Sequence, residues 1–354
     1  MKYEIISLQP LRVENTSYNA ALSYLGRENL IKIKFIEFSL LRQVWLIWRG
    51  TTRKYPLSRI IKNIYAIVKL LLSKNKTLII GAAPYSIVVF LLNRLKSRNR
   101  CIFYTSWPYW DEKRYPERVF ISSQIKAWKK FLDGIISAGV TTASCEGIAK
   151  YGAKSFFMPH TIDTNLFRPL VTKPTSDKVK VLYVGKLLKI KGLPRIVNLV
   201  KNYNWQNIEF CIAGGGPYEE EIINMEKGHY PVRYLGYIEN KRDLVSIYQG
   251  SDILILPSFQ ENFGIVLIEA MACQLPVIAT DCAGPREIIE DDVNGMLIPQ
   301  DNEEALRDAV LQLANSPELR DKFGVNGRKK VEKMYDVKEA ARRWLEIIEI
   351  VHTT

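Results

Sequence analysis

The chain has 354 residues with a formal net charge of +13, and 47% of its residues are hydrophobic. Its length exceeds what one ordinary hydrophobic core supports and suits two domains of about 150 to 180 residues each. The longest strongly apolar run, residues 87–92, is too short to span a bilayer. The five cysteines are odd in number and lack a Cys-x-x-Cys pair, which predicts reduced thiols instead of a disulfide framework.

The first half alternates short apolar runs with segments of helical pattern. The apolar runs are residues 3–8, 31–38, 77–80, 102–104, 134–138 and 155–158. This alternation predicts a parallel sheet covered by helices on both faces. No signal-peptide layout precedes the first run, so we expect a cytoplasmic protein.

The positive charge belongs to this first half. Residues 1–170 hold 27 Lys and Arg against 10 Asp and Glu, a net charge of +17, whereas the remainder holds 23 against 27. No familiar nucleic-acid-binding module occurs there, and the basic residues are mixed with long apolar side chains and tryptophans. Residues 57–74 place Arg59, Lys62 and Lys69 on one side at helical spacing. A helix on an anionic membrane surface and a solvated face on a packed helix fit this pattern equally well.

A linker and a second alternation follow. Residues 168–178 contain prolines and small polar residues and predict the linker. Predicted strands then occupy residues 179–184, 209–213, 232–235, 253–256, 277–279 and 296–298. We therefore expect two doubly wound α/β domains, residues 1–168 and 169–335, with a substrate crevice between them. Residues 335–351 have helical periodicity and predict a last helix within residues 336–354.

The most informative segment is residues 257–271. The preceding predicted strand places Glu261 in the loop at its carboxyl end, Gly264 opens an apolar helix, and Glu269 lies within that helix. A helix N-terminus offers free N–H groups and partial positive charge, which suit a diphosphate. Carboxylates accept hydrogen bonds from sugar hydroxyls. The segment therefore predicts a sugar-nucleotide site.

Two more loops follow predicted strands. Residues 185–192 carry Lys186 and Lys191 between flanking glycines, and residues 213–217 carry three glycines and a proline. Glycines allow close backbone approach, and lysines can stabilise a departing diphosphate. A solubilising lysine triplet and an ordinary tight turn are the simpler interpretations. The spacing relative to the two glutamates favours the ligand site.

Together with residues 159–163, 281–287 and 294–295, these motifs resemble the retaining, GT-B-fold glycosyltransferases of family 4, the glycosyl transferases group 1. The resemblance covers roughly residues 155 to 335, and the first 150 residues match only in general character. It implies two Rossmann-like domains facing a central cleft, with the last helix crossing back to the first domain. It also implies a metal-independent hexosyltransferase that uses a nucleoside diphosphate sugar as substrate and needs no cofactor.

The resemblance also implies roles for individual residues. Glu261, Lys191 and Lys186 would form the catalytic set, with Glu261 on donor-sugar hydroxyls and the lysines on the diphosphate. The family commonly has arginine where Lys186 stands, and lysine lacks the bidentate fork of a guanidinium. Glu269 would hold the ribose hydroxyls. The remaining donor-binding residues would be Gly185, Gly215, Gly216, Ser258, Phe263, Gly264 and Ile265.

The first half departs from the family pattern. Many relatives carry a glycine-rich loop after the first strand and a cleft histidine after a later one. Residues 9–17 contain no glycine here, and residues 104–108 contain no histidine. Ser106, Trp107 and His160 are the acceptor-side candidates, although loop packing or a structural role explains each of them as well. The Asp291-Asp292 pair precedes an Asn-Gly turn, so we interpret it as a solvated turn and expect no metal site.

The leading hypothesis is a peripheral membrane glycosyltransferase on the cytoplasmic face. It would move a sugar, with a UDP-sugar favoured, to a lipid-linked glycan or glycolipid in cell-surface polysaccharide assembly. Its other expected partner is an anionic membrane surface, and nucleic acid is not expected. One alternative is a catalytically silent GT-B glycan-binding partner of another transferase, which the departures in the first half support. A GT-B sugar-nucleotide epimerase is the other, and it explains the lysine-rich loop and the basic half less well.

Overall fold

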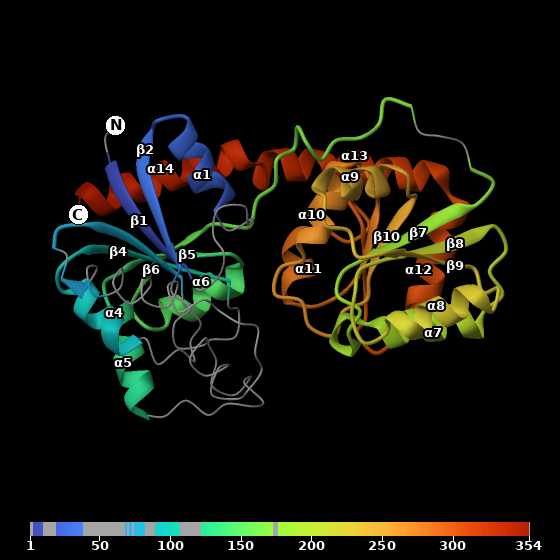
Figure 1. Cartoon of the computed structure of the whole chain (residues 1–354), viewed down its shortest axis with the longest axis horizontal. Helices are drawn as coiled ribbons and strands as arrows, with labels where there is room; N and C mark the ends of the chain where they lie inside the picture. The colour runs from blue at the N-terminus through green and yellow to red at the C-terminus, as the bar shows by residue number, and fades with distance from the viewer. Residues whose placement is uncertain are drawn as a thin grey trace. The chain divides into compact units, whose positions relative to one another are not determined.

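The chain divides into two compact α/β units (Figure 1). The computed structural model describes residues 3–9, 19–37, 68, 71–72, 74–81, 89–106, 122–172 and 176–353. The first unit comprises Met1–Thr161 with Val337–Thr354, and the second comprises Ile162–Asp336. The boundary thus precedes residue 168, because the Ile162 N–H donates to the Tyr335 carbonyl at 3.0 Å and Phe167 packs on Tyr248.

The described strands of the first unit form a six-stranded parallel sheet in the order β2-β1-β3-β4-β5-β6. They are β1 (Tyr3–Gln9), β2 (Ile31–Glu37), β3 (Thr77–Gly81), β4 (Arg100–Thr105), β5 (Ile136–Gly139) and β6 (Lys154–Phe157). The described helices between these strands are α1 (Ala20–Arg27), α4 (Val89–Lys96), α5 (Ser122–Leu132) and α6 (Thr142–Ala149). Phe103, Trp128 and Phe131 are fully or almost fully buried and pack ring against ring between β4 and α5.

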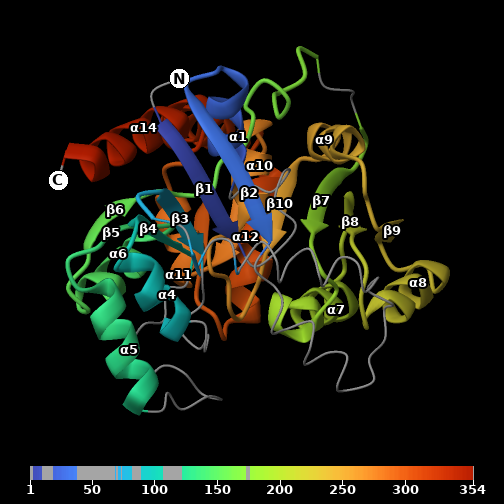
Figure 2. The same ribbon diagram turned by 60° about the vertical axis from the view of Figure 1, so that its left-hand side comes forward.

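The last helix, α14 (Val337–Thr353), belongs to the first unit. It lies beside α1 in both ribbon views (Figures 1 and 2). Trp344 is buried and meets Tyr104 edge-on, with ring centroids 5.5 Å apart. Near the end of the helix, His352 Nε2 lies 2.9 Å from Thr77 Oγ1 in a hydrogen bond. Residues from the far end of the chain therefore complete this unit's core.

The second unit contains another six-stranded parallel sheet, in the order β12-β11-β10-β7-β8-β9. Its strands are β7 (Val179–Val184), β8 (Ile208–Ala213), β9 (Val232–Gly236), β10 (Ile253–Leu256), β11 (Val277–Thr280) and β12 (Met296–Ile298). Its α-helices are α7 (Leu193–Asn202), α8 (Glu219–Lys227), α9 (Lys241–Gln249), α10 (Ile265–Ala272), α11 (Ala283–Ile288), α12 (Glu303–Asn315) and α13 (Pro317–Met334). The chain proceeds outward from β7 to β9, then returns to β10 on the other side of β7 and proceeds to β12. The strand order therefore reverses between β7 and β10.

The sheets confirm the predicted α/β class with two doubly wound domains. Strands β10 and β11 are buried along their whole length, which explains their unbroken apolar sequences. Part of the predicted basic helix, residues 57–67, and the loop of residues 10–18 lie outside the described residues. No helix in the described part of the chain is both long and apolar enough to cross a membrane. All five cysteines are free thiols.

Candidate functional site

Three loops of the second unit meet at the carboxyl ends of β7, β10 and β8. The Phe259 N–H, after β10, donates to the Ile190 carbonyl, after β7, at 2.9 Å. The Leu187 N–H donates in turn to the Gly215 carbonyl, after β8, at 3.1 Å. The loops therefore gather where the strand order reverses, which is where open α/β sheets bind their ligands.

Glycines make this close meeting of loops possible. Gly192 has a φ of +82°, and a Cβ atom there would overlap the Pro257 carbonyl. A Cβ atom on Gly214 would overlap the carbonyl of Gly185. Gly216 also lies against backbone, with an added Cβ 2.7 Å from the Leu187 oxygen, whereas Gly215 has more room. The glycine motifs are thus needed for the backbone to approach itself.

Lys191 and Glu261 form an ion pair at this junction. Lys191 ends the short 3₁₀ helix η2 (Lys189–Lys191), and its Nζ lies 2.7 Å from Glu261 Oε2. The side chains are 28% and 14% exposed, so the pair is partly shielded and yet open to a ligand. A Cβ atom on Gly264 would lie 3.5 Å from Glu261 Cγ, which places Glu261 beside the start of α10. The structure thus joins two residues that the sequence analysis assigned to different parts of a donor.

The N-terminus of α10 is held in place and has no side-chain cap. Gly264 precedes the helix with a φ of +96°, and no described side chain caps it. Phe263 is buried and meets Tyr335 edge-on at 5.8 Å, while Ile265 begins the helix half-buried. An uncapped helix start presents N–H groups and partial positive charge, both of which favour an anion.

Glu269 lies one turn into α10 and is paired with a neighbouring helix. The hydroxyl of Tyr248, on α9, donates to Glu269 Oε2 at 2.8 Å. Burial raises the pKa of Glu269 to about 7, although the Tyr248 hydrogen bond and Lys241 act in the opposite direction. The carboxyl group is thus poised to gain or lose a proton near neutral pH. Sequence reasoning missed Tyr248, whose only signal is its place on the buried side of a short helix.

Ser258 lies in the loop after β10, and Arg195 packs against the same loop. Ser258 is fully buried, and its Oγ has no hydrogen-bond partner among the described residues. The Arg195 side chain, on α7, lies 3.9 Å from the centre of the Phe259 ring and donates to the Pro257 carbonyl at 3.3 Å. Arg195 is only 6% exposed. Arg195 therefore stabilises the loop after β10, a role that nothing in its sequence surroundings indicates.

The remaining predicted site residues are divided between the two units. Lys186 is exposed, and its backbone carbonyl accepts a hydrogen bond from the Tyr183 hydroxyl at 2.9 Å. Ser106, after β4, and His160 belong to the first unit. His160 is buried, and burial lowers its pKa to about 3, so its ring is neutral at physiological pH. Trp107 lies outside the described residues.

The Asp291-Asp292 pair lies in an exposed turn. Asp292 has a φ of +58°, and an Asp291 carboxylate oxygen accepts from the Leu297 N–H at 2.8 Å. Within the ranges that the structure describes, no group of three or more His, Cys, Asp or Glu is arranged to hold a metal ion.

Solved structures define the class of this architecture. Sucrose-phosphate synthase from Thermosynechococcus elongatus matches with a TM-score of 0.76 at 16% identity, covering 99% of each chain. HepE from Anabaena, solved with UDP and glucose, matches with a TM-score of 0.69 at 13% identity, covering 98% of this chain and 100% of that one. The chain therefore has the GT-B fold of glycosyltransferases, as predicted.

The sequence comparisons identify the family of the second unit. Residues 170–330 match the glycosyl transferases group 1, so this unit carries a domain of that family. An uncharacterized glycosyltransferase of Methanocaldococcus jannaschii is 32% identical over 149 residues, which are 42% of this chain and 41% of that protein. A capsular polysaccharide biosynthesis glycosyltransferase of Staphylococcus aureus, CapM, is 26% identical over 189 residues, or 51% and 48% of the two chains. The chain thus spans about half the length, or less, of these relatives.

Proposed function

We propose that the protein is a retaining glycosyltransferase that moves a sugar from a nucleoside diphosphate donor, with a UDP-sugar favoured, to a lipid-linked glycan or glycolipid. The observation that carries this proposal is the Lys191–Glu261 pair beside the uncapped start of α10, at the reversal of strand order. An ammonium group, a carboxylate and free N–H groups suit a sugar diphosphate. The match of residues 170–330 to glycosyl transferases group 1 supports the same class of reaction.

In the proposed reaction the acceptor hydroxyl oxygen bonds to the anomeric carbon while the bond from that carbon to the diphosphate breaks. The hydroxyl proton passes to the departing phosphate oxygen. Lys191, Lys186 and the N–H groups at Gly264 and Ile265 stabilise the charge that develops on the diphosphate. As Lys191 turns to the phosphates, Glu261 is released from its ion pair and accepts a hydrogen bond from a sugar hydroxyl. Attack and departure on the same face of the sugar retain its configuration.

Glu269 holds the ribose hydroxyls in this proposal, and Ser258 Oγ is available to bind a ligand oxygen. The UDP in the HepE structure and the capsular role in the name of the Staphylococcus aureus relative support a UDP-sugar and a cell-surface glycan. The net charge of +17 in residues 1–170 supports peripheral attachment to an anionic membrane on its cytoplasmic face. The donor chemistry needs no metal ion or cofactor in this scheme, since the lysines and α10 supply the positive charge.

A transfer assay tests the proposal. The purified full chain is incubated with UDP-sugars and lipid-linked acceptors, and the products are followed by mass spectrometry and by NMR of the anomeric proton. We expect slow donor hydrolysis without an acceptor and glycosylated product with one, in the anomeric configuration of the donor. Nucleotide binding without turnover under all acceptor conditions would instead indicate a silent glycan-binding partner. Conversion of the donor into its epimer would indicate an epimerase.

Donor binding should depend on pH through Glu269. Its pKa in the free protein is raised to about 7, and ribose hydroxyls donate to the ionised carboxylate, so binding favours loss of the proton. Affinity should therefore be highest above neutral pH and should fall as pH drops through the raised pKa. The expected loss is about tenfold between about pH 8 and about pH 6. Calorimetry with a UDP-sugar measures it, because the sugar-linked diphosphate has no titrating phosphate in this range.

Two variants assign that pH dependence to Glu269. In Glu269→Gln, binding should be weaker at all pH values and should no longer vary across this range. In Tyr248→Phe, loss of the hydrogen bond that lowers the Glu269 pKa should move the fall in affinity to higher pH. An unchanged profile in Glu269→Gln would show that another group titrates.

A further inference from the structure

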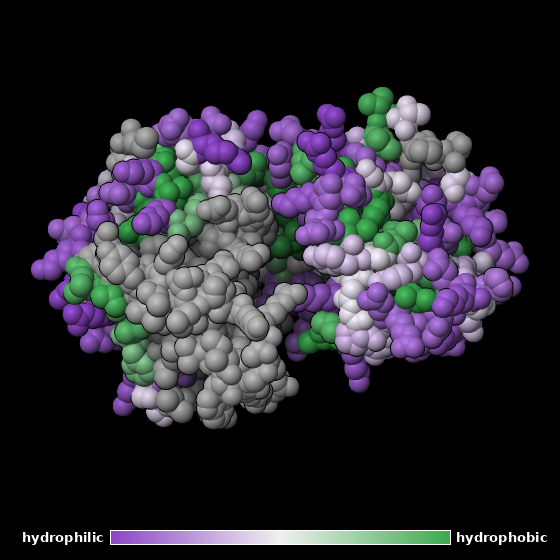
Figure 3. Space-filling model, in the orientation of Figure 1, coloured by the Kyte–Doolittle hydropathy of each residue, from purple (hydrophilic) through white to green (hydrophobic). Residues whose placement is uncertain are grey.

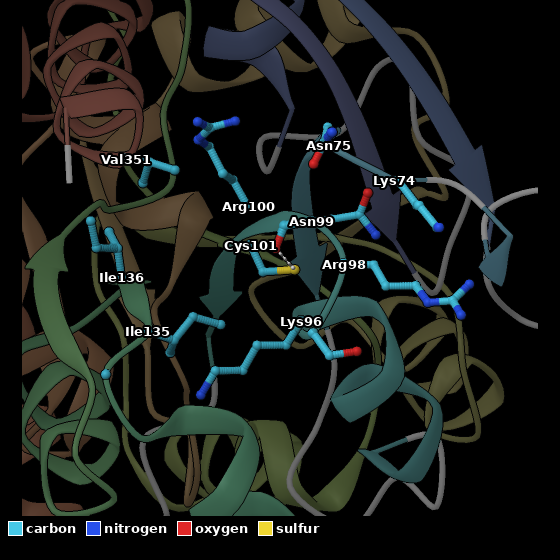
Figure 4. Close-up of a pocket in the computed structure, with 12 residues that line it drawn as sticks. Lys74, Asn75, Lys96, Arg98, Asn99, Arg100, Cys101, Ile135, Ile136 and Val351 are labelled. Atoms are coloured by element: carbon cyan, nitrogen blue, oxygen red, sulfur yellow. Dashed lines mark hydrogen bonds between the residues drawn. The ribbon is translucent and has the colours of Figure 1, made fainter.

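A pocket with a basic lining lies in the first unit, at the amino ends of β3, β4 and β5 (Figure 4). It is open to solvent and has a volume of about 860 Å³. Its walls come from the residues before β3, the turn between α4 and β4, the residues before β5, and Val351 of α14. Ligands of open α/β sheets bind at the carboxyl ends of the strands. This pocket lies at the opposite edge of its sheet, so it is separate from any reaction site that the sheet would form.

Four cations and no carboxylate line this pocket. The cations are Lys74, Lys96, Arg98 and Arg100. No carboxylate among the described residues forms an ion pair with any of the four. Asn75, Ser97 and Asn99 add polar groups. A concave surface that collects one sign of charge concentrates the opposite ion.

Lys96 has a structural role within this group. Its ammonium donates to the Lys130 carbonyl at 3.1 Å and to the Asp133 carbonyl, and so satisfies the end of α5. Lys96 therefore contributes charge from a fixed position. Among the described residues, the side chains of Lys74, Arg98 and Arg100 make no such bond and are the groups available to a ligand.

The backbone that carries these side chains is fixed. The Asn75 N–H donates to the Arg98 carbonyl at 2.8 Å, and the Arg100 N–H donates to the Lys76 carbonyl at 2.9 Å. Lys76 N–H also donates to Asn99 Oδ1 at 3.0 Å. In Figure 4, Lys74 and Arg98 lie on one side of the pocket and Lys96 on another, with Arg100 on the side of Val351. The cations are thus arranged around the pocket on a rigid frame.

The positive potential acts on a neighbouring group. Burial and then the charge of Arg100 lower the pKa of His352, on α14. The same two causes would keep this imidazole neutral near the pocket, so it adds no further charge. Glu4 is paired at 3.3 Å with Lys76, which is not part of the pocket lining, and no Asp or Glu is among the residues that line the pocket.

We propose that this pocket binds a phosphate group, held by Arg98 and Arg100 with Lys74 at its rim. Guanidinium groups match phosphate oxygens with two parallel hydrogen bonds and are always charged, and a lysine adds a point charge. The phosphate could belong to a soluble ion or to a lipid headgroup, because the recognising chemistry is the same.

Exposed apolar side chains on the two segments that lead into the pocket give the lipid source a physical basis. Leu72 is 64% exposed two positions before Lys74, and Val68 is 48% exposed one turn earlier. On α4, which ends at Lys96, Phe90 is 47% exposed and Leu91 is 37% exposed. Figure 3 shows hydrophobic residues on the face of the first unit over α4 and α5. Apolar residues beside basic ones are typical of surfaces that enter a lipid interface.

A charge-matched pair of variants of the full chain tests the site. Arg98→Gln with Arg100→Gln removes two pocket charges. Lys32→Gln with Lys150→Gln removes two exposed charges elsewhere in the same unit. Calorimetric titration with inorganic phosphate is performed with saturating UDP, so that phosphate does not report on a nucleotide site. We expect the pocket variant to bind phosphate about tenfold more weakly or worse, and the surface variant to bind like the wild type.

The second arm separates the sources of the phosphate. Wild type and both variants are floated with phosphatidylcholine vesicles that contain or lack phosphatidylglycerol. Binding of inorganic phosphate that the pocket variant loses supports a soluble ligand. Flotation with the anionic vesicles alone, lost in the pocket variant and kept in the surface variant, supports a headgroup. The absence of both interactions, or an equal loss in the two variants, overturns the proposal.

UDP binding by all three proteins serves as the internal control. It should be unchanged, because the altered arginines lie in the first unit and the proposed donor site lies in the second. Failure of UDP to bind the wild type would count against the proposed transferase, and the phosphate and vesicle results would still decide the pocket.

Discussion

Replacing Lys191 by alanine should lower the rate of sugar transfer by about 10²- to 10³-fold. Lys191 is the cation that the structure holds beside the start of α10, through its 2.7 Å contact with Glu261. Its removal takes away positive charge where negative charge develops on the diphosphate, and it leaves Glu261 without its cationic partner beside the same phosphates. Both effects raise the free energy of the transition state relative to that of the free reactants. Initial rates of transfer at saturating acceptor measure the loss.

Lys189→Ala is the matched control. Lys189 lies in the same 3₁₀ helix and is exposed, and the contact of its backbone carbonyl with the Gly192 N–H survives the substitution. Its rate should stay close to that of the wild type. Removal of Lys191 leaves the partly buried Glu261 without its ion-pair partner, which could destabilise the fold. Thermal unfolding of both variants therefore serves as the control for a folding defect. Equal activity of Lys191→Ala and wild type would remove Lys191 from the reaction.

Replacing Gly192 by alanine should destabilise the second unit by about 4 kcal/mol or more. Two costs combine at this position. The φ of +82° is unfavourable for any residue with a side chain, and the added methyl group would overlap the Pro257 carbonyl. Either the loop after β7 or the loop after β10 must then move, and the hydrogen bond between Phe259 and Ile190 is strained with them. Denaturant unfolding followed by tryptophan fluorescence measures the change in free energy.

Gly236→Ala separates these two costs. Gly236 also has a positive φ, +73°, but an added Cβ would meet nothing within 4 Å. The variant should therefore lose only the backbone contribution of about 1–2 kcal/mol. A loss in Gly192→Ala no larger than in Gly236→Ala would mean that the two loops do not approach each other as closely as the structure has them.

Much of the fold follows from local sequence. The predicted strands at residues 179–184, 253–256 and 296–298 coincide with β7, β10 and β12. Of these, β10 is buried at all four positions and needs an unbroken apolar sequence. The ends of other strands differ by one or two residues, since polar residues such as Arg100 extend the hydrogen-bonded ladder beyond the apolar run. The start of α10 at Ile265 follows from the glycine before it.

The partners within the candidate site were not predictable in this way. The Lys191–Glu261 pair joins residues 70 positions apart, and the contact of Arg195 with Pro257 spans 62. Such contacts depend on how neighbouring strands align, which local patterns do not determine. The buried state of Glu269 was foreseeable from its apolar neighbours, but its bond to Tyr248 was not. Likewise, Lys74 meets the three pocket cations of residues 96–100 because β3 and β4 are adjacent.

The placement of α14 in the first unit has a practical consequence for dissecting the protein. A fragment that stops after Thr161 would strip the aromatic partner from Tyr104 and the imidazole from Thr77, leaving apolar surface uncovered. Removing the C-terminal helix therefore destabilises the N-terminal part of the chain. A minimal version of the first unit would need α14 joined by a designed linker to the segment that ends at Thr161.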